Sequence, residues 1–122
     1  ATWCGPCQRE IPHFVSLHQK FKDRGLEIVG INYEQETDPD ELNQLMRRAI
    51  RDKRIPYQCI VGDEATRQQI PAFGGFPTTL FLDRQGRVRA KLVGYHEYDE
   101  LEALVEGLLE DAADSDSIAA RE

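Results

Sequence analysis

The sequence predicts a single α/β domain with a mixed sheet, and three observations indicate this fold class. Helical and strand-like hydrophobic patterns alternate along most of the 122 residues. Two strand-like segments near the C-terminal end are separated only by a short turn, which is typical of an antiparallel hairpin. The length suits one modest hydrophobic core. We therefore expect residues 1–110 to form one domain, with helices on both faces of its sheet.

Three longer helices are predicted from apolar residues that recur every three or four positions. The first begins at Cys4, and the last covers about residues 97–110. Between them, Asp38 is a good N-cap for a helix that has Pro39 in its first position, and Glu41 completes a capping box. The apolar faces of the three helices comprise Ile11, Phe14, Val15 and Phe21; Leu42, Leu45, Met46, Ala49 and Ile50; and Leu101, Leu104, Val105, Leu108 and Leu109.

Four strands and one short helix are predicted between these helices. Short runs of β-branched and aromatic residues indicate the strands, and Pro71 stops the short helix. The strands cover residues 26–33, 57–61, 78–82 and 87–93, and the short helix covers residues 64–70. The tail, residues 111–122, is acidic and rich in Ala and Ser, so we expect it to be disordered or to serve as a linker.

The composition indicates a globular protein and excludes one class of partner. Apolar residues make up 40% of the chain and charged residues 30%, and the formal net charge is −7. A surface with this charge repels phosphate backbones, so we do not expect nucleic acid as a partner. The apolar stretches are too short to span a bilayer. We expect the domain to be a monomer.

The chain begins at Ala1, without a methionine, three residues before its first cysteine. A Cys-x-x-Cys motif that opens a helix normally follows a strand, and no strand precedes this one. We therefore expect a fragment that lacks an N-terminal central strand and is weaker than its full-length parent. A targeting signal or membrane anchor would also lie in the missing segment, so the lack of one excludes no compartment.

Two of the three cysteines, Cys4 and Cys7, follow Trp3 and are separated by Gly5 and Pro6. Thiol–disulfide exchange needs a thiolate, which the partial positive charge of a helix N-terminus stabilises. We expect Cys4 to be the exposed, attacking thiol, and Cys7, one turn further on, to face inward and close a disulfide with it. Gly5 and Pro6 make the tight start that brings the sulfur atoms into range, and we expect Trp3 to cover the site.

Two other interpretations of the cysteine motif are less favoured. A zinc site needs two more ligands at suitable spacing, and the candidates are Cys59 and three histidines that form no paired motif, His13, His18 and His96. A purely structural disulfide across so short a loop gains little chain entropy. For Cys59 itself the favoured interpretation is an inert strand cysteine, and the alternative is a resolving or regulatory thiol.

Two further residues keep open interpretations at this point. Glu10 lies one turn after Cys7 and is either a solvated helix charge or a proton partner for the buried thiol. Pro77 follows two glycines and Phe76 and precedes a strand. It is either an ordinary turn proline or a cis-proline beside the cysteines.

The segment that contains both cysteines, residues 1–7, resembles the active-site run of the thioredoxin superfamily. Further features resemble the TlpA/ResA-like branch of thiol–disulfide oxidoreductases within it. These features are Glu10, Pro12, residues 75–86 and residues 92–95, together with residues 56–70, which match the strand-and-helix insert of that branch. The resemblance implies a thioredoxin-like three-layer sandwich. Pro71 and Ala72 depart from it, because an aromatic–glycine pair is expected at their place.

The resemblance also implies roles for residues of the site. Cys4 is the implied nucleophile and Cys7 the resolving thiol, and Pro77 is the implied cis-proline. Phe76 pairs its backbone with an extended substrate segment, and Gly94 is a further substrate-binding position. The implied activity is reduction of protein disulfides through a mixed disulfide, with no cofactor besides the Cys4–Cys7 disulfide.

The Gly-Pro dipeptide between the cysteines resembles thioredoxin, whose potential of about −270 mV favours reduction over the oxidation expected near about −120 mV. Two alternatives stay open. One is a thiol peroxidase of the peroxiredoxin type, although Thr2 and Cys4 lack the Pro-x-x-x-Thr-x-x-Cys spacing. The other is a non-catalytic binding or metal-carrier module. The branch implies an extracytoplasmic protein reduced by a membrane thiol carrier, and a cytoplasmic protein reduced by a flavin reductase is the alternative.

Overall fold

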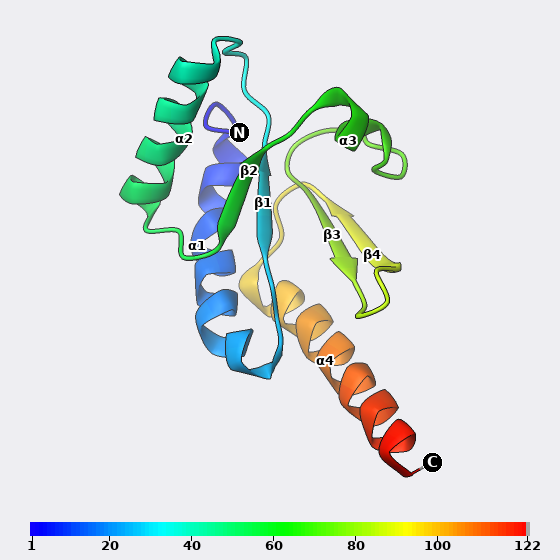
Figure 1. Cartoon of the computed structure of the whole chain (residues 1–122). Coiled ribbons are helices and arrows are strands. Elements are labelled where there is room, and N and C mark those ends of the chain that lie inside the picture. Colours follow the sequence, from blue (N-terminus) through cyan, green and yellow to red (C-terminus); the bar gives the residue numbers. More distant parts are fainter. Residues whose placement is uncertain (122) are drawn as a thin grey trace.

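The computed structural model describes the backbone of residues 1–121 and the side chains of residues 1–112. Each predicted element is present, in the predicted order. The elements are α1 (Gly5–Phe21), the 3-10 helix η1 (Lys22–Arg24), β1 (Val29–Asn32), α2 (Pro39–Lys53), β2 (Gln58–Val61), α3 (Glu64–Gln68), β3 (Thr78–Leu82), β4 (Val88–Val93) and α4 (Tyr98–Arg121) (Figure 1).

Local capping explains where two of the helices begin. Cys4 is the N-cap of α1, and its Sγ accepts a hydrogen bond from the Cys7 backbone N–H. Asp38 caps α2 by accepting from the backbone N–H of Asp40. The predicted capping box is wrong in one partner, because Glu36 rather than Glu41 accepts from the backbone N–H of Asp38. A carboxylate two residues before the cap reaches the same donor from the other side.

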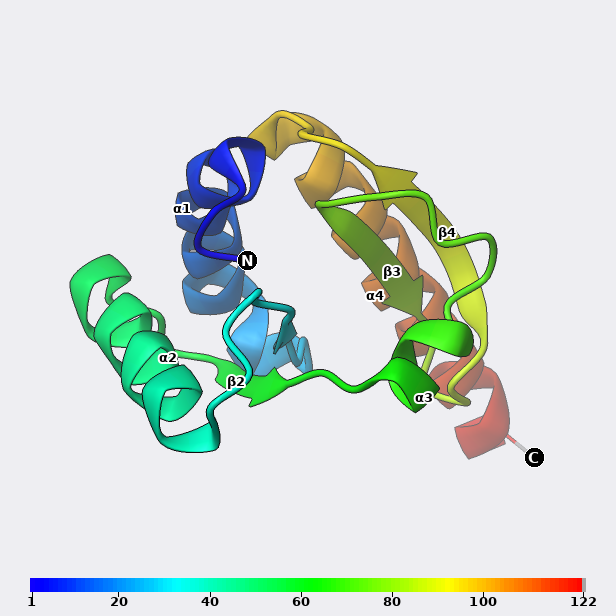
Figure 2. The ribbon, with the colours of Figure 1, turned by 90° about the horizontal axis from the view of Figure 1, so that it is seen from above.

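The strands show the predicted mixture of parallel and antiparallel pairing, but they form two separate pairs. β1 and β2 pair in parallel, with Gly30 opposite Cys59, and β3 and β4 pair antiparallel, with Thr79 opposite Leu92. Among residues 1–121 no hydrogen bonds join the two pairs into one sheet. Figure 2 shows α2 on the side of β1 and β2, and α4 behind β3. The two strand pairs therefore lie next to different helices.

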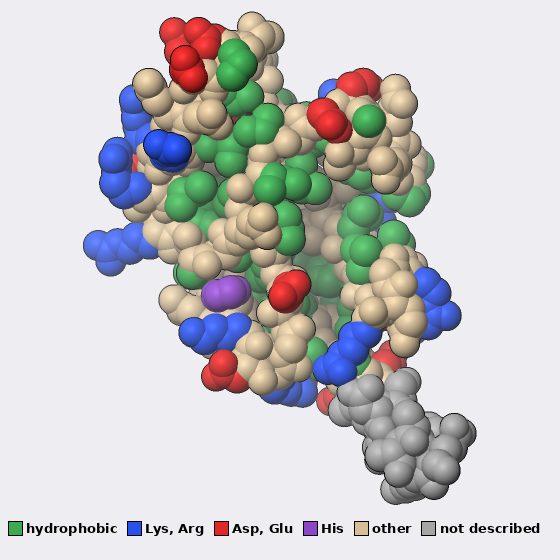
Figure 3. Space-filling model, viewed as in Figure 1, with side chains coloured by type: hydrophobic (Ala, Val, Ile, Leu, Met, Phe, Trp, Pro, Cys, Tyr) green, Lys and Arg blue, Asp and Glu red, His purple; other side chains and the backbone are tan. Residues whose placement is uncertain are grey.

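Apolar side chains of the parallel pair remain partly open to solvent. Val29 and Ile31 of β1 are 50% and 39% exposed, and Ile60 and Val61 of β2 are 38% and 42% exposed. Figure 3 shows apolar side chains open on this face of the molecule. The parallel pair thus contributes less buried apolar area than its composition allows.

The hydrophobic core lies where α1, β3 and α4 meet. Its fully or largely buried members are Leu17 and Phe21 from α1, Phe81 from β3, and Leu101 and Val105 from α4. Four of the five lie on the predicted apolar faces or the predicted strand, and Leu17 is a core residue that the predicted face of the first helix lacks. The core therefore fixes α1, which begins at the cysteine motif, against the C-terminal helix.

Two ion pairs on the surface also connect α1, and the 3-10 helix η1 that continues it, to α4. Lys20 Nζ lies 2.6 Å from Glu102 Oε1, and Arg24 Nη1 lies 3.3 Å from Glu106 Oε2. The partners are 82 residues apart in both pairs. The step of four residues from Lys20 in α1 to Arg24 in η1 therefore matches a step of four along α4, so α1 and α4 run in the same direction (Figure 1).

The last helix is longer than the sequence predicts. It was expected to end near Glu110, and α4 continues to Arg121. Alanines at positions 112, 113, 119 and 120 supply the helix propensity that the acidic composition obscures. The side chains from residue 113 onward and the backbone of residue 122 lie outside the described part of the chain. A linker role for residues 111–122 therefore stays a prediction.

Candidate functional site

Cys4 and Cys7 form a disulfide at the N-terminal end of α1, with their Cα atoms 5.3 Å apart. Pro6 occupies the first turn, where its missing N–H costs no helix hydrogen bond. The predicted exposure of Cys4 is wrong for this form, because Cys4 is only 5% exposed, and Cys7 is half-buried. In the turn before the helix, the backbone N–H of Cys4 donates to the carbonyl of Ala1 at 3.3 Å.

That turn is held by two residues that directly follow β1. Glu34 accepts hydrogen bonds from the backbone N–H of Thr2 at 2.6 Å and from its hydroxyl at 2.9 Å. The Trp3 indole N–H donates to the carbonyl of Tyr33 at 3.2 Å. The sequence reasoning missed both residues. The available signal was their place at the end of a predicted strand, where the chain leaves the sheet beside a helix N-terminus.

The loop that contains Pro77 lies beside the cysteine motif. The Phe76–Pro77 peptide bond is cis, as the resemblance implied. The Phe76 ring meets the Trp3 ring edge to face, with centroids 5.4 Å apart. Trp3 is 52% exposed and so covers the site only in part. Gly94, with a φ of +85°, donates its backbone N–H to the carbonyl of Pro77 at 2.8 Å.

Glu10 is buried, with 1% of its surface exposed, so the interpretation as a solvated helix charge is wrong. Its Oε2 accepts from the backbone N–H of His96 at 2.8 Å, and its Oε1 has no hydrogen-bond partner. Burial raises the pKa of the Glu10 carboxyl, and the hydrogen bond from His96 offsets part of that rise. A carboxyl one turn after Cys7 is therefore poised to hold a proton more tightly than an exposed one.

The histidines are spread over the molecule. His13 Nε2 lies 2.8 Å from the Tyr95 hydroxyl, and His96 Nδ1 lies 2.7 Å from Glu100 Oε2. The hydrogen bond with Glu100 raises the pKa of His96. Nδ1 of His18 is buried without a partner. Among the described residues, no three His, Cys, Asp or Glu side chains gather in a way that could hold a metal ion.

Cys59, the third cysteine, is a free thiol in β2 and is half-buried. Burial raises the pKa of its thiol, which disfavours the reactive thiolate. The structure therefore brings together Cys4, Cys7, Trp3, Phe76 and Pro77, and leaves Cys59 outside the disulfide. No helix among the described residues has both the length and the apolar composition needed to cross a bilayer.

Comparisons with known proteins identify the family. Residues 1–91 match the AhpC/TSA family. The chain is 25% identical over 105 residues to thiol-disulfide oxidoreductase ResA of Bacillus cereus, covering 86% of this chain and 57% of ResA. It is 27% identical over 115 residues to thiol:disulfide interchange protein HelX of Rhodobacter capsulatus, covering 93% of this chain and 60% of HelX. The chain thus spans little more than half the length of these relatives.

Solved structures share the fold. A thiol:disulfide interchange protein of the thioredoxin family from Chlorobium tepidum superposes with a TM-score of 0.71 at 22% identity, over 89% of this chain and 74% of that one. StoA from Bacillus subtilis superposes with a TM-score of 0.68 at 19% identity, over 85% and 75% of the two chains. The predicted thioredoxin-like fold is thereby confirmed. The chain belongs to the AhpC/TSA family, and its similarity to ResA and HelX supports the predicted TlpA/ResA-like branch.

Proposed function

We propose that this chain carries the active site of a thiol–disulfide oxidoreductase that reduces disulfides in other proteins. One observation carries the proposal: Cys4 and Cys7 are joined as a disulfide at the N-terminal end of α1. That position offers backbone N–H groups and a partial positive charge to a thiolate. The names of the relatives, which are thiol-disulfide oxidoreductase and thiol:disulfide interchange protein, support the same activity.

The proposed reaction begins with the reduced pair. The Cys4 thiolate attacks one sulfur of a substrate disulfide, the substrate S–S bond breaks, and one substrate thiolate leaves with a proton from solvent. Cys7 then loses its proton and attacks Cys4 Sγ in the mixed disulfide. The second substrate sulfur leaves as a thiolate and takes up the proton that Cys7 released. Two electrons pass from the cysteine pair to the substrate, and the Cys4–Cys7 disulfide remains. An external dithiol donor reduces that disulfide and restores the pair.

Glu10 is proposed as the group that receives the proton of Cys7. It lies one turn further along α1, it is buried, and one of its oxygens has no partner. A carboxylate in such surroundings is a stronger base than an exposed one, because burial disfavours its charged form. The His96 backbone N–H holds the other oxygen, so the carboxyl keeps a fixed orientation.

The remaining site residues are proposed to shape the site and hold the substrate segment. Gly5 and Pro6 set the start of α1, and Trp3 flanks Cys4. Phe76 and Pro77 offer backbone groups to an extended segment, as in strand addition. Gly94 acts through Pro77, whose carbonyl it holds at 2.8 Å, and is therefore a positioning residue.

The proposed partners are protein disulfides and an upstream electron donor, with the chain acting as a monomer. We place the protein outside the cytoplasm, with a membrane thiol carrier as donor, because the TlpA/ResA-like branch implies that compartment. The Gly-Pro dipeptide supports reduction as the direction of electron flow. A thiol peroxidase is not favoured, because the cysteine pair has Cys-x-x-Cys spacing and neither relative is named for peroxide chemistry.

Trapping of the mixed disulfide tests this proposal. In a Cys59→Ser background, we expect the Cys7→Ser variant to form a stable adduct with a peptide disulfide, because no second thiol can resolve it. The Cys4→Ser variant is the matched control and should form none. Intact-protein mass spectrometry before and after dithiothreitol measures the adduct. Equal adducts on both variants, or none on Cys7→Ser, would contradict the assigned roles.

A further inference from the structure

Four aromatic side chains form a continuous cluster beside the disulfide, which we call the aromatic ledge: Trp3, Tyr33, Phe73 and Phe76. Phe76 lies at its centre, with ring centroids 5.4 Å from Trp3, 6.0 Å from Tyr33 and 5.2 Å from Phe73. Trp3 is 52% exposed, and the other three are half-buried. These rings come from three separate parts of the chain, yet none belongs to the hydrophobic core. The ledge therefore presents apolar surface to whatever approaches Cys4.

Arg67, from α3, lies over the far end of this ledge. Its guanidinium carbon is 4.8 Å from the centroid of Phe73 and 6.0 Å from that of Phe76. The side chain is exposed, and no carboxylate among the described residues forms an ion pair with it. The nearby Asp63 carboxylate is engaged elsewhere, because it caps α3 by accepting from the Thr66 backbone N–H at 2.8 Å.

The ledge is anchored on the side away from the cysteines. Lys91 of β4 donates to the carbonyls of Pro71 and Ala72 at 2.8 and 3.0 Å. These carbonyls directly precede Phe73, so the loop that carries both phenylalanines is tied to the hairpin. The Thr78 hydroxyl closes the other end by donating to the carbonyl of Gly75 at 2.5 Å. Arg67 therefore rests on rings whose backbone has fixed partners.

The Arg67 guanidinium lies beside two aromatic rings and has N–H donors available to a further partner. Arg recognises carboxylates through two parallel hydrogen bonds, and stacking on aromatic rings orients its fork. The chain as a whole carries a net charge of −7, and Asp63 and Glu64 lie near enough to act on Tyr33 of the ledge. Arg67 supplies a positive charge, outside any ion pair among the described residues, in this acidic surface. Charge complementarity then favours a partner with an acidic group at that point.

We propose that Arg67 determines substrate specificity, so that the site exchanges fastest with protein segments that place an Asp or Glu close to the target cysteine and apolar residues along the ledge. The inference rests on the proposed thiol–disulfide exchange and adds the substrate class. The occupant is a polypeptide, because the ledge adjoins the disulfide that the substrate cysteine must reach. The carboxylate pairs with Arg67 at the rim, where such contacts act mainly on the association rate.

The experiment compares three symmetric peptide disulfides that differ only in whether Glu, Gln or Lys lies near the cysteine. Pre-reduced protein in a Cys59→Ser background is mixed with each peptide, and the fluorescence of Trp3, the single tryptophan, reports oxidation of the neighbouring pair. The variants are Arg67→Met and Arg67→Gln. Arg47→Met, at an exposed position on α2, is the matched control with the same change in net charge. Hydroxyethyl disulfide is small and uncharged, so its reaction rate measures thiol–disulfide exchange that does not depend on contacts with the aromatic ledge or with Arg67.

We expect the full chain to react about threefold faster with the Glu peptide than with the Lys peptide at low salt, as suits one exposed ion pair. High salt should reduce this ratio, and both Arg67 variants should abolish it, whereas Arg47→Met retains it. A ratio of one in the unsubstituted chain, or an unchanged ratio in the Arg67 variants, overturns the inference and leaves the proposed function intact. Failure to react even with hydroxyethyl disulfide overturns the proposed function, and this inference with it.

Discussion

Among the described side chains, Glu10 is the only charged one that is buried. The position is costly, because a carboxylate loses its hydration and receives one backbone hydrogen bond in return. A neutral carboxyl avoids most of that cost, which is why burial raises the pKa of Glu10. The same residue therefore links the cysteine site to the stability of the fold.

We expect stability to fall as the pH rises through the raised pKa of Glu10. Because the folded protein holds this proton more tightly than the unfolded chain does, the loss begins at the ordinary value of 4.5 and continues upward. Glu10→Gln should lessen the fall in unfolding midpoint between pH 4.5 and pH 8, and Glu27→Gln, at an exposed position, should not. Denaturant unfolding across this range measures both. Parallel pH profiles of the Glu10→Gln variant and the unsubstituted chain would contradict the assignment.

A residue's role could be predicted when its partners lie close to it in the sequence, and not when they lie far away. Cys4, Cys7 and the N-cap Asp38 could be predicted, because their chemistry depends on neighbours within one helical turn. The contact of Thr2 with Glu34 could not, since the partners are 32 residues apart and nothing local marks either one. The predicted exposure of Cys4 was wrong for the same reason, because its burial depends on residues far away in the sequence.

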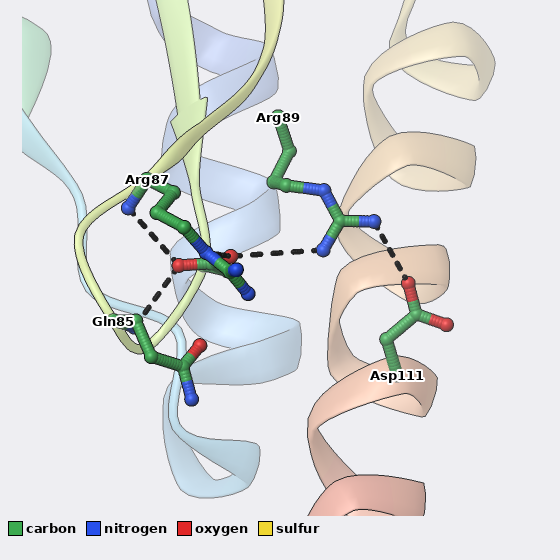
Figure 4. A network of polar contacts seen from close by, with 5 residues as sticks. Gln85, Arg87, Arg89 and Asp111 are labelled. Atoms are coloured by element: carbon green, nitrogen blue, oxygen red, sulfur yellow. Dashed lines mark hydrogen bonds and ion pairs between the residues drawn. The ribbon is translucent and has the colours of Figure 1, made fainter.

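The hairpin turn shows how one element is specified by one side chain. Asp83 accepts from the backbone N–H groups of Gln85 and Arg87 at 3.0 Å each and from Arg87 Nε at 2.9 Å. Arg89 lies 3.6 Å from the same carboxylate and reaches Asp111 of α4 at 3.5 Å (Figure 4). Burial acts to raise the pKa of Asp83, but these hydrogen bonds outweigh it and hold the pKa below its ordinary value.

Replacement of Asp83 should therefore matter most above pH 4. A carboxyl with a lowered folded pKa stabilises the protein above its ordinary value of 3.8, and that stabilisation disappears as the pH falls through the folded pKa. We expect Asp83→Asn to lower the thermal midpoint at pH 7 and to weaken the dependence on pH between 4 and 2. Calorimetry at several pH values measures this. Asp111→Asn breaks only the ion pair with Arg89 and should change the midpoint less; an equal change would assign the effect to the pair.

Most elements could be predicted because each has its own local signal. The turn that contains Asp83 and Gly86 predicts the hairpin, and its strands match the predicted ranges within one residue. Helix α4 extends further than predicted, because the helix propensity of Ala outweighs the acidic composition of the tail. Ala72 adopts a φ of +47°, a conformation that suits the glycine expected there from the resemblance.

For the molecule as a whole, stability depends on the junction of α1, β3 and α4. Leu101 is completely buried at that junction. We expect Leu101→Ala to lower the free energy of unfolding by about 2–5 kcal/mol, because it removes buried methyl groups and leaves a cavity. Leu82→Ala is the matched control at a side chain that is 49% exposed, and it should cost less than about 1 kcal/mol. Equal losses, measured by denaturant unfolding, would place the core elsewhere.

The arrangement of the sheet was the least predictable feature at this scale. Periodicity identifies β1, β2, β3 and β4, and alternation with helices predicts mixed pairing. Neither signal states which strand edges meet, because pairing depends on contacts between segments far apart in the sequence. The two pairs in the structure are therefore consistent with every local pattern that suggested one sheet.

The constant offset of 82 residues between α1 and α4 has a consequence for register. If α4 slid by one turn, Lys20 would face Glu106 and Arg24 would face Glu110, so both charged contacts would be replaced by equivalent ones. The ion pairs alone therefore do not distinguish the observed register from the slipped one. The contact of His13 with Tyr95 shares the same offset, but the slip would bring Asp99 opposite His13 and move Leu101 out of its buried position. The register of the two helices is thus fixed by the Tyr95 hydroxyl contact and by the burial of Leu101. The ion pairs are compatible with this register but do not select it.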